Sequence, residues 1–316
     1  MKLYLGIDDG QSGTTALIGD EAGRVIGSGK AGPCNHVHGL EGRPKFIGAI
    51  TGCLTNACRE AGIDASHIVF ESAGLGFSGG PEDKEALLHE IFQTKHQIVT
   101  TDALIALSGA LAGNPGIVTI AGTGSIAYGR NAAKRTARAG GWGYMIGDEG
   151  GGFDLARQAL RAALRHEEGW GPPTALRDLF LAESEAVDVN DLLHRFYTTD
   201  YPRPKIASFS KLVDRAAMDG DAVAQGILTN ASQELATITS AVRSQLFEHH
   251  ESVRVSYIGG VFRSQMLMER FRLLVELEEG NQVAPPVFGP AAGALMEAYS
   301  AAGSHVTLTS VPEFEK

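Results

Sequence analysis

The sequence predicts a two-domain α/β protein, and three observations lead to this expectation. The chain has 316 residues, which is enough for two domains with separate cores. In its first third, short apolar strand patterns alternate with amphipathic helical segments. A strand–turn–strand pattern with a glycine-rich loop occurs near the N-terminus and again after residue 115. We therefore expect two structurally similar halves with a ligand in the cleft between them.

The first half begins as three short strands joined by tight turns and continues with alternating helices and strands. The strands are expected at residues 2–7, 14–19, 25–30, 67–73 and 97–101. The helices are expected at residues 44–61, at 82–91 and from 102 to about 113. Asn114-Pro115-Gly116 interrupts this pattern, so the sequence predicts the domain boundary there.

The second half repeats the strand pattern and then becomes mainly helical. Strands are expected at residues 116–121, 125–130 and 253–258. Helices are expected at residues 154–165, 221–247 and 290–302, with Asp221 as the residue that begins the long one. The predicted domains therefore span residues 1–115 and 116–289.

Composition and charge narrow the class of protein. A net charge of -10 argues against a nucleic-acid partner, because binding a phosphate backbone requires a basic surface. The three cysteines are too few for a disulfide framework in a chain of this length. Neither a signal-peptide core nor an apolar run of about 20 residues is present, so we expect a cytoplasmic protein without a membrane partner.

Asp8 ends the first strand and precedes a loop of small residues, Gly10-Gln11-Ser12-Gly13. A carboxylate at the end of a buried strand costs free energy unless it is paired or binds a metal ion. Glycine-rich turns let backbone N–H groups approach an anion closely. We interpret the segment as a phosphate loop with Mg2+ near Asp8, the alternative being a surface Asp that starts a turn.

Two further glycine clusters follow strand patterns in the second half. Gly122-Thr123-Gly124-Ser125 offers backbone N–H groups and hydroxyls to phosphate oxygens, although a Gly-Thr-Gly hairpin is also ordinary. Gly259-Gly260 follows a buried strand and is interpreted as the place where adenine or ribose approaches the backbone. Together with the first loop, these clusters predict a bound nucleotide.

Acidic and polar residues indicate a second, polar substrate. Asp102 follows a strand and precedes an Ala-rich helix, which suits both a helix N-cap and a general base for a hydroxyl. Asp148 lies among glycines just after the apolar residues Trp142 and Tyr144, so we expect a packed loop that presents a carboxylate to sugar hydroxyls rather than a solvated turn. His36 belongs to a polar loop that is more consistent with substrate contact than with a zinc site.

Taken in order, these segments resemble a known family over nearly the whole chain. The segments are Gly6 to Asp8, Gly32 to His36, Leu75 to Gly80, Thr101 to Ala103, Gly122 to Ser125, Gly140 to Gly150 and Gly259 to Val261. The set resembles the superfamily of acetate and sugar kinases, heat-shock chaperone ATPases and actin. Within it, the chain is similar to the BadF/BadG/BcrA/BcrD ATPase family, and there to N-acetylglucosamine kinases.

The resemblance implies two ribonuclease-H-like (actin-like ATPase) domains that close on ATP, Mg2+ and a sugar. It implies that the C-terminal helix, within residues 290–316, packs back on the first domain. Asp102 matches the catalytic base. The matches to sugar-binding positions are Asn35, His36, Gly76, Gly141 and Asp148. The matches to nucleotide-binding positions are Gly10, Gln11, Ser12, Gly122, Thr123, Gly124, Ser125, Gly259 and Gly260. Related kinases are commonly dimers, so the resemblance allows this chain to form a homodimer.

Three departures from the family pattern leave the substrate open. Asp9 adds a negative charge to the first loop. Gly76 stands where some relatives have a sugar-contacting Ser, and Ala139 replaces a Cys near the sugar. The predicted activity is phosphorylation of the 6-hydroxyl of N-acetylglucosamine, with glucosamine as the alternative sugar. An activator ATPase and a non-catalytic sugar sensor are the rival functions, and the activator is disfavoured because no cysteine follows Cys58.

Overall fold

The computed structural model consists of two compact units, Met1–Gly116 with Pro285–Lys316, and Ile117–Ala284. It describes residues 1–10, 13–34, 42–65, 68–78 and 84–316. Each unit is built on one five-stranded sheet, with the orders β3-β2-β1-β4-β5 and β8-β7-β6-β9-β10. Each sheet therefore has the order 3-2-1-4-5 when its strands are counted along the chain, which is ribonuclease-H-like topology.

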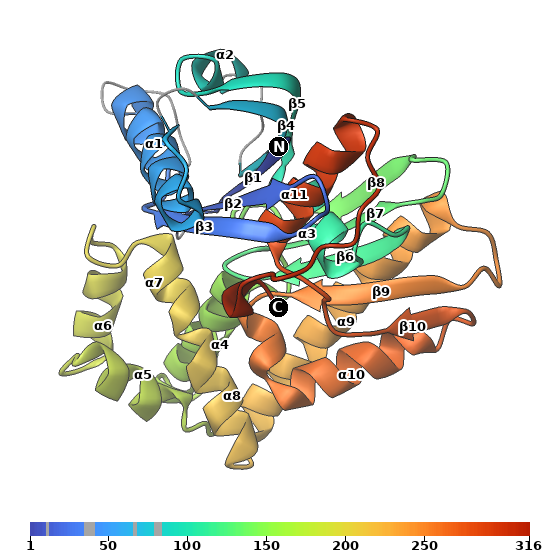
Figure 1. Ribbon diagram of the computed structural model, residues 1–316. Coiled ribbons are helices and arrows are strands. Elements are labelled where there is room, and N and C mark those ends of the chain that lie inside the picture. The colour runs from blue at the N-terminus through green and yellow to red at the C-terminus, as the bar shows by residue number, and fades with distance from the viewer. Residues whose placement is uncertain (11–12, 35–41, 66–67, 79–83) are drawn as a thin grey trace. The chain divides into compact units, whose positions relative to one another are not determined.

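The first unit carries an antiparallel meander extended by two parallel strands. Its strands are β1 (Leu3–Asp9), β2 (Thr14–Asp20), β3 (Val25–Ala31), β4 (Val69–Phe77) and β5 (Gln93–Thr101). Its helices are α1 (Gly42–Ala61), α2 (Glu85–Leu88), α3 (Asp102–Ala110) and α11 (Pro290–Ala301). Figure 1 shows α1 beside the strands of this sheet. Helices α3 and α11 lie next to each other, apart from α1.

The alternation of side chains along β1 separates the two faces of this sheet. Leu5 and Ile7 are buried in the same core as α1, whereas Tyr4 packs with α11. Gly6 lies against α11 so closely that a Cβ there would be 2.7 Å from the carbonyl oxygen of Ala291. Because side chains alternate, Asp8 belongs to the α11 face and Asp9 to the α1 face.

The C-terminal segment returns to the first unit, but its α-helix ends at Ala301. Gly303 then adopts a left-handed conformation, with φ of +71°, which ends the helix. Beyond it, Thr309 bridges to Arg24 beside the start of β3, and Glu315 lies in the short 3-10 helix η3 (Glu313–Glu315). The Glu315 carboxylate accepts a hydrogen bond of 3.1 Å from the Ala292 N–H at the start of α11.

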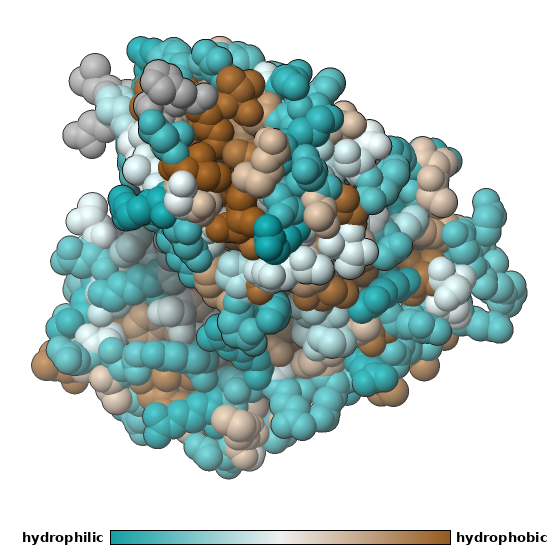
Figure 2. Space-filling view, in the orientation of Figure 1, coloured by the Kyte–Doolittle hydropathy of each residue, from teal (hydrophilic) through white to brown (hydrophobic). Residues whose placement is uncertain are grey.

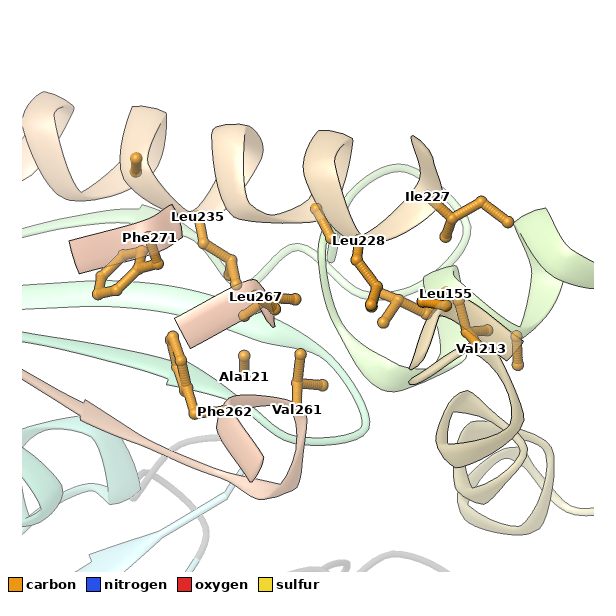
Figure 3. Packing of buried hydrophobic residues seen from close by; sticks show 14 of the residues in the cluster. Ala121, Leu155, Val213, Ile227, Leu228, Leu235, Val261, Phe262, Leu267 and Phe271 are labelled. Carbon is orange, nitrogen blue, oxygen red and sulfur yellow. The ribbon is translucent and has the colours of Figure 1, made fainter. Parts of the chain in front are cut away.

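The second unit packs a larger set of helices around its sheet. Its strands are β6 (Gly116–Ala121), β7 (Ser125–Arg130), β8 (Thr136–Gly140), β9 (Val253–Ile258) and β10 (Asn281–Val283). Its helices are α4 (Gly152–Glu167), α5 (Leu176–Ser184), α6 (Val189–Phe196), α7 (Arg203–Ser208), α8 (Ser210–Met218), α9 (Ala222–Leu246), η2 (Gly260–Arg263) and α10 (Gln265–Glu276). Figure 3 shows its core, where Leu228 of α9 lies beside Leu155 of α4.

Several elements differ from the sequence expectation for identifiable reasons. Of the helix expected at residues 82–91, residues 82 and 83 lie outside the described residues, and the described part is helical over Glu85–Leu88 and ends there because the chain turns to enter β5 at Gln93. The edge strand β8 was not expected, since its alternation of alanine with polar residues gives little apolar signal. Helix α10 and strand β10 were also missed. Within the described ranges, no helix has the combined length and apolar character needed to cross a membrane.

Candidate active site

In the first unit, Asp8 lies near the end of β1 and Asp102 directly follows β5. These two strands end at the same edge of the sheet. Asp8 of β1 is in register with Gly76 of β4, which in turn is in register with Thr100 of β5. Asp8 is half-buried, and its pKa is raised well above the usual value, first by burial and then by the carboxylates of Glu315, Asp102 and Asp9. This edge of the sheet therefore concentrates negative charge.

Asp102 is the first residue of α3, just after the N-cap Thr101, whose hydroxyl accepts a 3.4 Å hydrogen bond from the Leu104 N–H. The hydroxyl of Ser78 donates to Asp102 Oδ2 over 2.6 Å, and the Ala103 N–H donates to Oδ1 over 2.8 Å. Both carboxylate oxygens thus accept hydrogen bonds, which hold the carboxylate in one orientation at the start of α3.

Ser78 is a residue that sequence reasoning missed, although it lies within the Leu75 to Gly80 segment that was singled out. The segment was read for Gly76, which the structure places inside β4 beneath Ile105. A Cβ at Gly76 would come within 2.5 Å of Ile105 Cγ1, so this position has no room for a side chain. Gly76 can therefore offer a ligand only its backbone, whereas Ser78 directs its hydroxyl to Asp102.

Asp9 is fully buried on the face of the sheet opposite Asp8. Its Oδ1 accepts hydrogen bonds from the Thr14 hydroxyl over 3.2 Å and from the Cys34 N–H over 3.3 Å. Burial raises its pKa, and the contacts to Cys34 and Thr14 partly offset this effect. Asp9 thus holds the chain around Cys34 in place through hydrogen bonds in the protein interior.

The second unit builds the Gly122–Ser125 loop on the N-terminus of α4. The N–H groups of Gly152 and Phe153 donate to the carbonyls of Gly122 and Thr123 over 2.8 and 3.0 Å. The Ser125 hydroxyl donates to the Glu149 carbonyl over 2.6 Å, so it holds the two loops together. These hydrogen bonds seat the loop on the first turn of α4, so the positive end of the helix dipole lies beneath it.

A cavity of about 460 Å3 lies beside this loop within the second unit. Gly122 and Thr123 line it together with Gly260. Gly259, which precedes Gly260, has φ of +116°, and a Cβ there would be 2.9 Å from the Gly122 nitrogen. The two glycine clusters are thus neighbours, although Gly259 lies 137 positions after Gly122 in the sequence. Further lining residues are Leu155, Pro204, Ala207, Ser208, Ser210, Lys211, Asp214, Leu228, Val261, Arg263 and Ser264.

The acidic glycine loop, residues 140–150, folds against the Gly122–Ser125 loop. The Gly141 N–H donates to the Ser125 carbonyl over 2.9 Å, and Gly141 adopts φ of +72°, where an added Cβ would be 2.8 Å from Ile126 Cδ1. Asp148 is buried in a left-handed conformation, with φ of +64°, and forms an ion pair with Arg203 of α7. Arg203 is a second residue that the sequence did not reveal, because nothing local relates it to residue 148.

Four predicted site residues, Gln11, Ser12, Asn35 and His36, lie outside the described residues. The Gly10 N–H donates to the Gly13 carbonyl over 3.0 Å. Figure 2 shows apolar surface gathered over the strands of the first unit, on a face that is otherwise largely hydrophilic.

Two sheets of the same 3-2-1-4-5 order, with a glycine loop seated on a helix N-terminus, define an actin-like ATPase fold. The chain belongs to the BadF/BadG/BcrA/BcrD ATPase family, whose sequence profile matches residues 5–298.

Named relatives and a solved structure extend this similarity over most of the chain. The N-acetylmuramic acid/N-acetylglucosamine kinase of Clostridium acetobutylicum is 32% identical over 281 residues, which cover 88% of this chain and 91% of the relative. The glucosamine kinase of Vibrio cholerae is 27% identical, covering 83% of this chain and 85% of the relative. A structure from Chromobacterium violaceum, named as a candidate N-acetylglucosamine kinase, aligns with a TM-score of 0.76 at 25% identity, covering 94% of this chain and 98% of that one.

Proposed function

We propose that this protein is an ATP-dependent kinase that phosphorylates the 6-hydroxyl of N-acetylglucosamine. The observation that carries the proposal is the cavity of about 460 Å3, because the Gly122–Ser125 loop and the turn at Gly260 line the same space. A nucleoside fits a partly apolar cavity of this size, with its phosphates directed at the loop on α4. The family is one of ATPases, and the relatives named above are amino-sugar kinases.

In the proposed reaction, Asp102 acts on the sugar. Its carboxylate accepts the proton of the 6-hydroxyl while that oxygen forms a bond to the γ-phosphorus of ATP. The bond from the γ-phosphorus to the β–γ bridging oxygen breaks, and ADP leaves with the electron pair. Ser78 holds the Asp102 carboxylate in one orientation, and the N–H groups of the Gly122–Ser125 loop stabilise phosphate charge.

The first unit also has a place that fits Mg2+. Burial raises the pKa of Asp8, and the neighbouring carboxylates of Glu315 and Asp102 raise it further; a divalent cation beside Asp8 would relieve the repulsion between these carboxylates. Mg2+ usually takes one or two protein carboxylates and completes its shell with water and substrate phosphates. Among the residues the structure describes, no group of three His, Cys, Asp or Glu side chains could hold a metal ion by itself. When bound, Mg2+ would neutralise charge on the β- and γ-phosphates.

A coupled ADP-release assay with ATP and Mg2+ tests the proposal. The sugars compared are N-acetylglucosamine, N-acetylmuramic acid, glucosamine, glucose and N-acetylmannosamine, with a sugar-free control. We expect the highest kcat/KM with N-acetylglucosamine and a phosphate on O6 of the product, as seen by phosphorus–proton NMR correlation. ADP release that does not depend on any sugar would contradict the kinase assignment, and sugar binding without ADP release would indicate a sensor.

Glucosamine is the second candidate substrate, because the Vibrio cholerae relative bears that name. Gly76 lies beneath Ile105 and offers no side chain, so this position contributes little to the choice between an amine and an acetamide. The ratio of kcat/KM for the two sugars decides the matter. If kcat/KM for glucosamine is higher by more than about tenfold, glucosamine replaces N-acetylglucosamine as the proposed substrate.

The activator function is disfavoured by the state of the cysteines. Cys34, Cys53 and Cys58 are all buried in the first unit with free thiols. Burial raises the pKa of Cys53 to about 12, and it also raises the pKa of Cys34 and Cys58. An iron–sulfur cluster needs thiolates that face it, so these thiols are poorly suited to hold one.

A further inference from the structure

Helix α7 contacts both parts of the site in the second unit. Pro204, Ala207 and Ser208 of this helix line the nucleotide cavity. Its first residue, Arg203, extends instead to the acidic glycine loop and pairs with Asp148. One short helix therefore connects the cavity proposed for ATP with the loop proposed for the sugar.

The Arg203–Asp148 pair is well shielded and held from several sides. The side chain of Asp148 is only 6% exposed and that of Arg203 is 27% exposed. The Gly143 N–H donates to Asp148 Oδ1 over 3.3 Å, and the Arg203 guanidinium carbon lies 5.0 Å from the centre of the Tyr144 ring. A shielded ion pair of this kind has a defined geometry, and removing one partner leaves the other charge uncompensated.

The pair also lies directly against Gly124 of the phosphate loop. A Cβ built on Gly124 would contact Asp148 Oδ2, and it would be 2.6 Å from Asp148 Cγ and 2.9 Å from Arg203 Nη2. A carboxylate so near the loop would repel the phosphates of ATP if its charge were not balanced. The guanidinium of Arg203 supplies this balance at the same point.

We propose that Arg203 is a positioning residue that neutralises Asp148 beside the phosphate loop, so that the Asp148 carboxylate can receive a sugar hydroxyl without repelling ATP. The part that concerns the sugar rests on the kinase function proposed above. The part that concerns ATP rests on the contact of the pair with Gly124 and holds for any nucleotide bound at this loop.

Four variants of the full-length protein separate these effects: Arg203→Met, Arg203→Lys, Asp148→Asn and the double variant Arg203→Met/Asp148→Asn. ATP affinity is measured by calorimetry with the β,γ-imido analogue of ATP and Mg2+, and sugar KM by ADP release. Arg203→Met should weaken binding of the analogue by about tenfold, since it leaves a bare carboxylate beside the phosphates. The double variant should restore binding to within about threefold of the unsubstituted protein, because the carboxamide carries no charge.

The sugar should respond differently from the nucleotide. Asp148→Asn and the double variant should both raise the sugar KM by about tenfold or more, because neither keeps the carboxylate. Arg203→Lys keeps the charge but loses the planar contact with Tyr144, so analogue binding should stay near normal while the sugar KM rises moderately. Arg272→Met, which removes an arginine paired with Glu276 on the surface of α10, is the matched control and should change neither value.

Equal loss of analogue binding in Arg203→Met and in the double variant would overturn the proposal, because it would make Arg203 a direct phosphate ligand or a purely structural residue. Circular dichroism and melting temperature identify a variant that fails to fold, and Arg203→Lys then remains as the informative variant. If the unsubstituted protein phosphorylates none of the sugars, the kinase assignment fails, yet the analogue-binding comparison still tests the neutralising role of Arg203.

Discussion

Asp102 has a structural role at the start of α3 and a proposed role in the reaction, and the two are compatible. Its position at the first turn of α3 places the carboxylate where helix N–H groups and the dipole favour negative charge. The hydrogen bond from Ser78 fixes the orientation of that carboxylate. The structural and the proposed catalytic interpretations of Asp102 are therefore compatible.

Asp102→Asn should lower kcat for sugar phosphorylation by about 100-fold or more while changing the sugar KM by less than about threefold. The carboxamide keeps the size of the side chain and its place on α3, but it cannot accept the proton. Steady-state kinetics measures the effect. Asp178→Asn, at a carboxylate that is 80% exposed, is the control. A turnover near normal in Asp102→Asn would remove Asp102 from the role of base.

Asp8 and Asp9 show that neighbours in sequence can have opposite environments. Both are acidic residues of β1, yet the alternation of a strand directs them to different faces. Asp8 faces the carboxylates of Asp102 and Glu315, whereas Asp9 holds Thr14 and Cys34 in the interior. The adjacent charges therefore belong to two different sets of interactions.

At the scale of elements, α9 shows how a cap can join distant segments. Asp221 accepts hydrogen bonds from the Ala224 N–H over 2.9 Å, the Ala175 N–H over 2.7 Å and the Thr174 hydroxyl over 2.8 Å. It thus begins α9 and also holds the start of α5. Burial acts to raise its pKa, but the donors at Ala224, Ala175 and Thr174 outweigh this effect, and the pKa lies below the usual value.

Asp221→Ala should lower the free energy of unfolding of the second unit by about 1 kcal/mol at pH 7, because it removes a capping acceptor. A carboxylate with a lowered pKa stabilises the folded state above its unfolded pKa of about 3.9, and this contribution is lost as the pH falls through the folded pKa. The difference between the two proteins in urea denaturation should therefore shrink below about pH 4. A difference that stays constant down to pH 3 would show that the charge of Asp221 contributes little.

At the scale of the whole chain, the first unit is assembled from both ends of the sequence. Helix α11 packs on β1 through Tyr4 and on β2 through Leu17, and the segment beyond it pairs with Arg24 and Val25. Leu308 and Val311 of that segment are buried in the same cluster. The N-terminal strands therefore complete their packing only after the C-terminus has been made.

Deleting residues 304–316 should destabilise the first unit by about 3 kcal/mol or more, because Leu308 and Val311 lose their buried surfaces. Hydrogen exchange read by mass spectrometry should show faster exchange in β2 and β3, with β7 and β9 of the second unit little changed. Phe314→Ala, which removes a ring that is 47% exposed, is the control and should have a small effect. Equal loss of protection in both units would contradict this division.

The sequence by itself determined what local patterns encode. Apolar runs and glycine turns located β1, β6, β7 and β9, and Asp221 was identified as the start of the long helix because capping depends on neighbouring residues. The glycine clusters and acidic residues indicated a nucleotide and a sugar, since those residue types recur wherever phosphate and hydroxyl groups bind. The edge strand β8 was missed because its own residue pattern is weak, and the strand forms by pairing with β7.

The tertiary structure alone decided which distant groups meet. Ser78 reaches Asp102, Arg203 neutralises Asp148 against Gly124, and Glu315 caps α11 near Asp8. None of these pairs is close in sequence, and each depends on the path of the chain between its members. A hydrogen bond or an ion pair needs its two groups within a few ångströms, and only the packing of strands and helices brings such groups together.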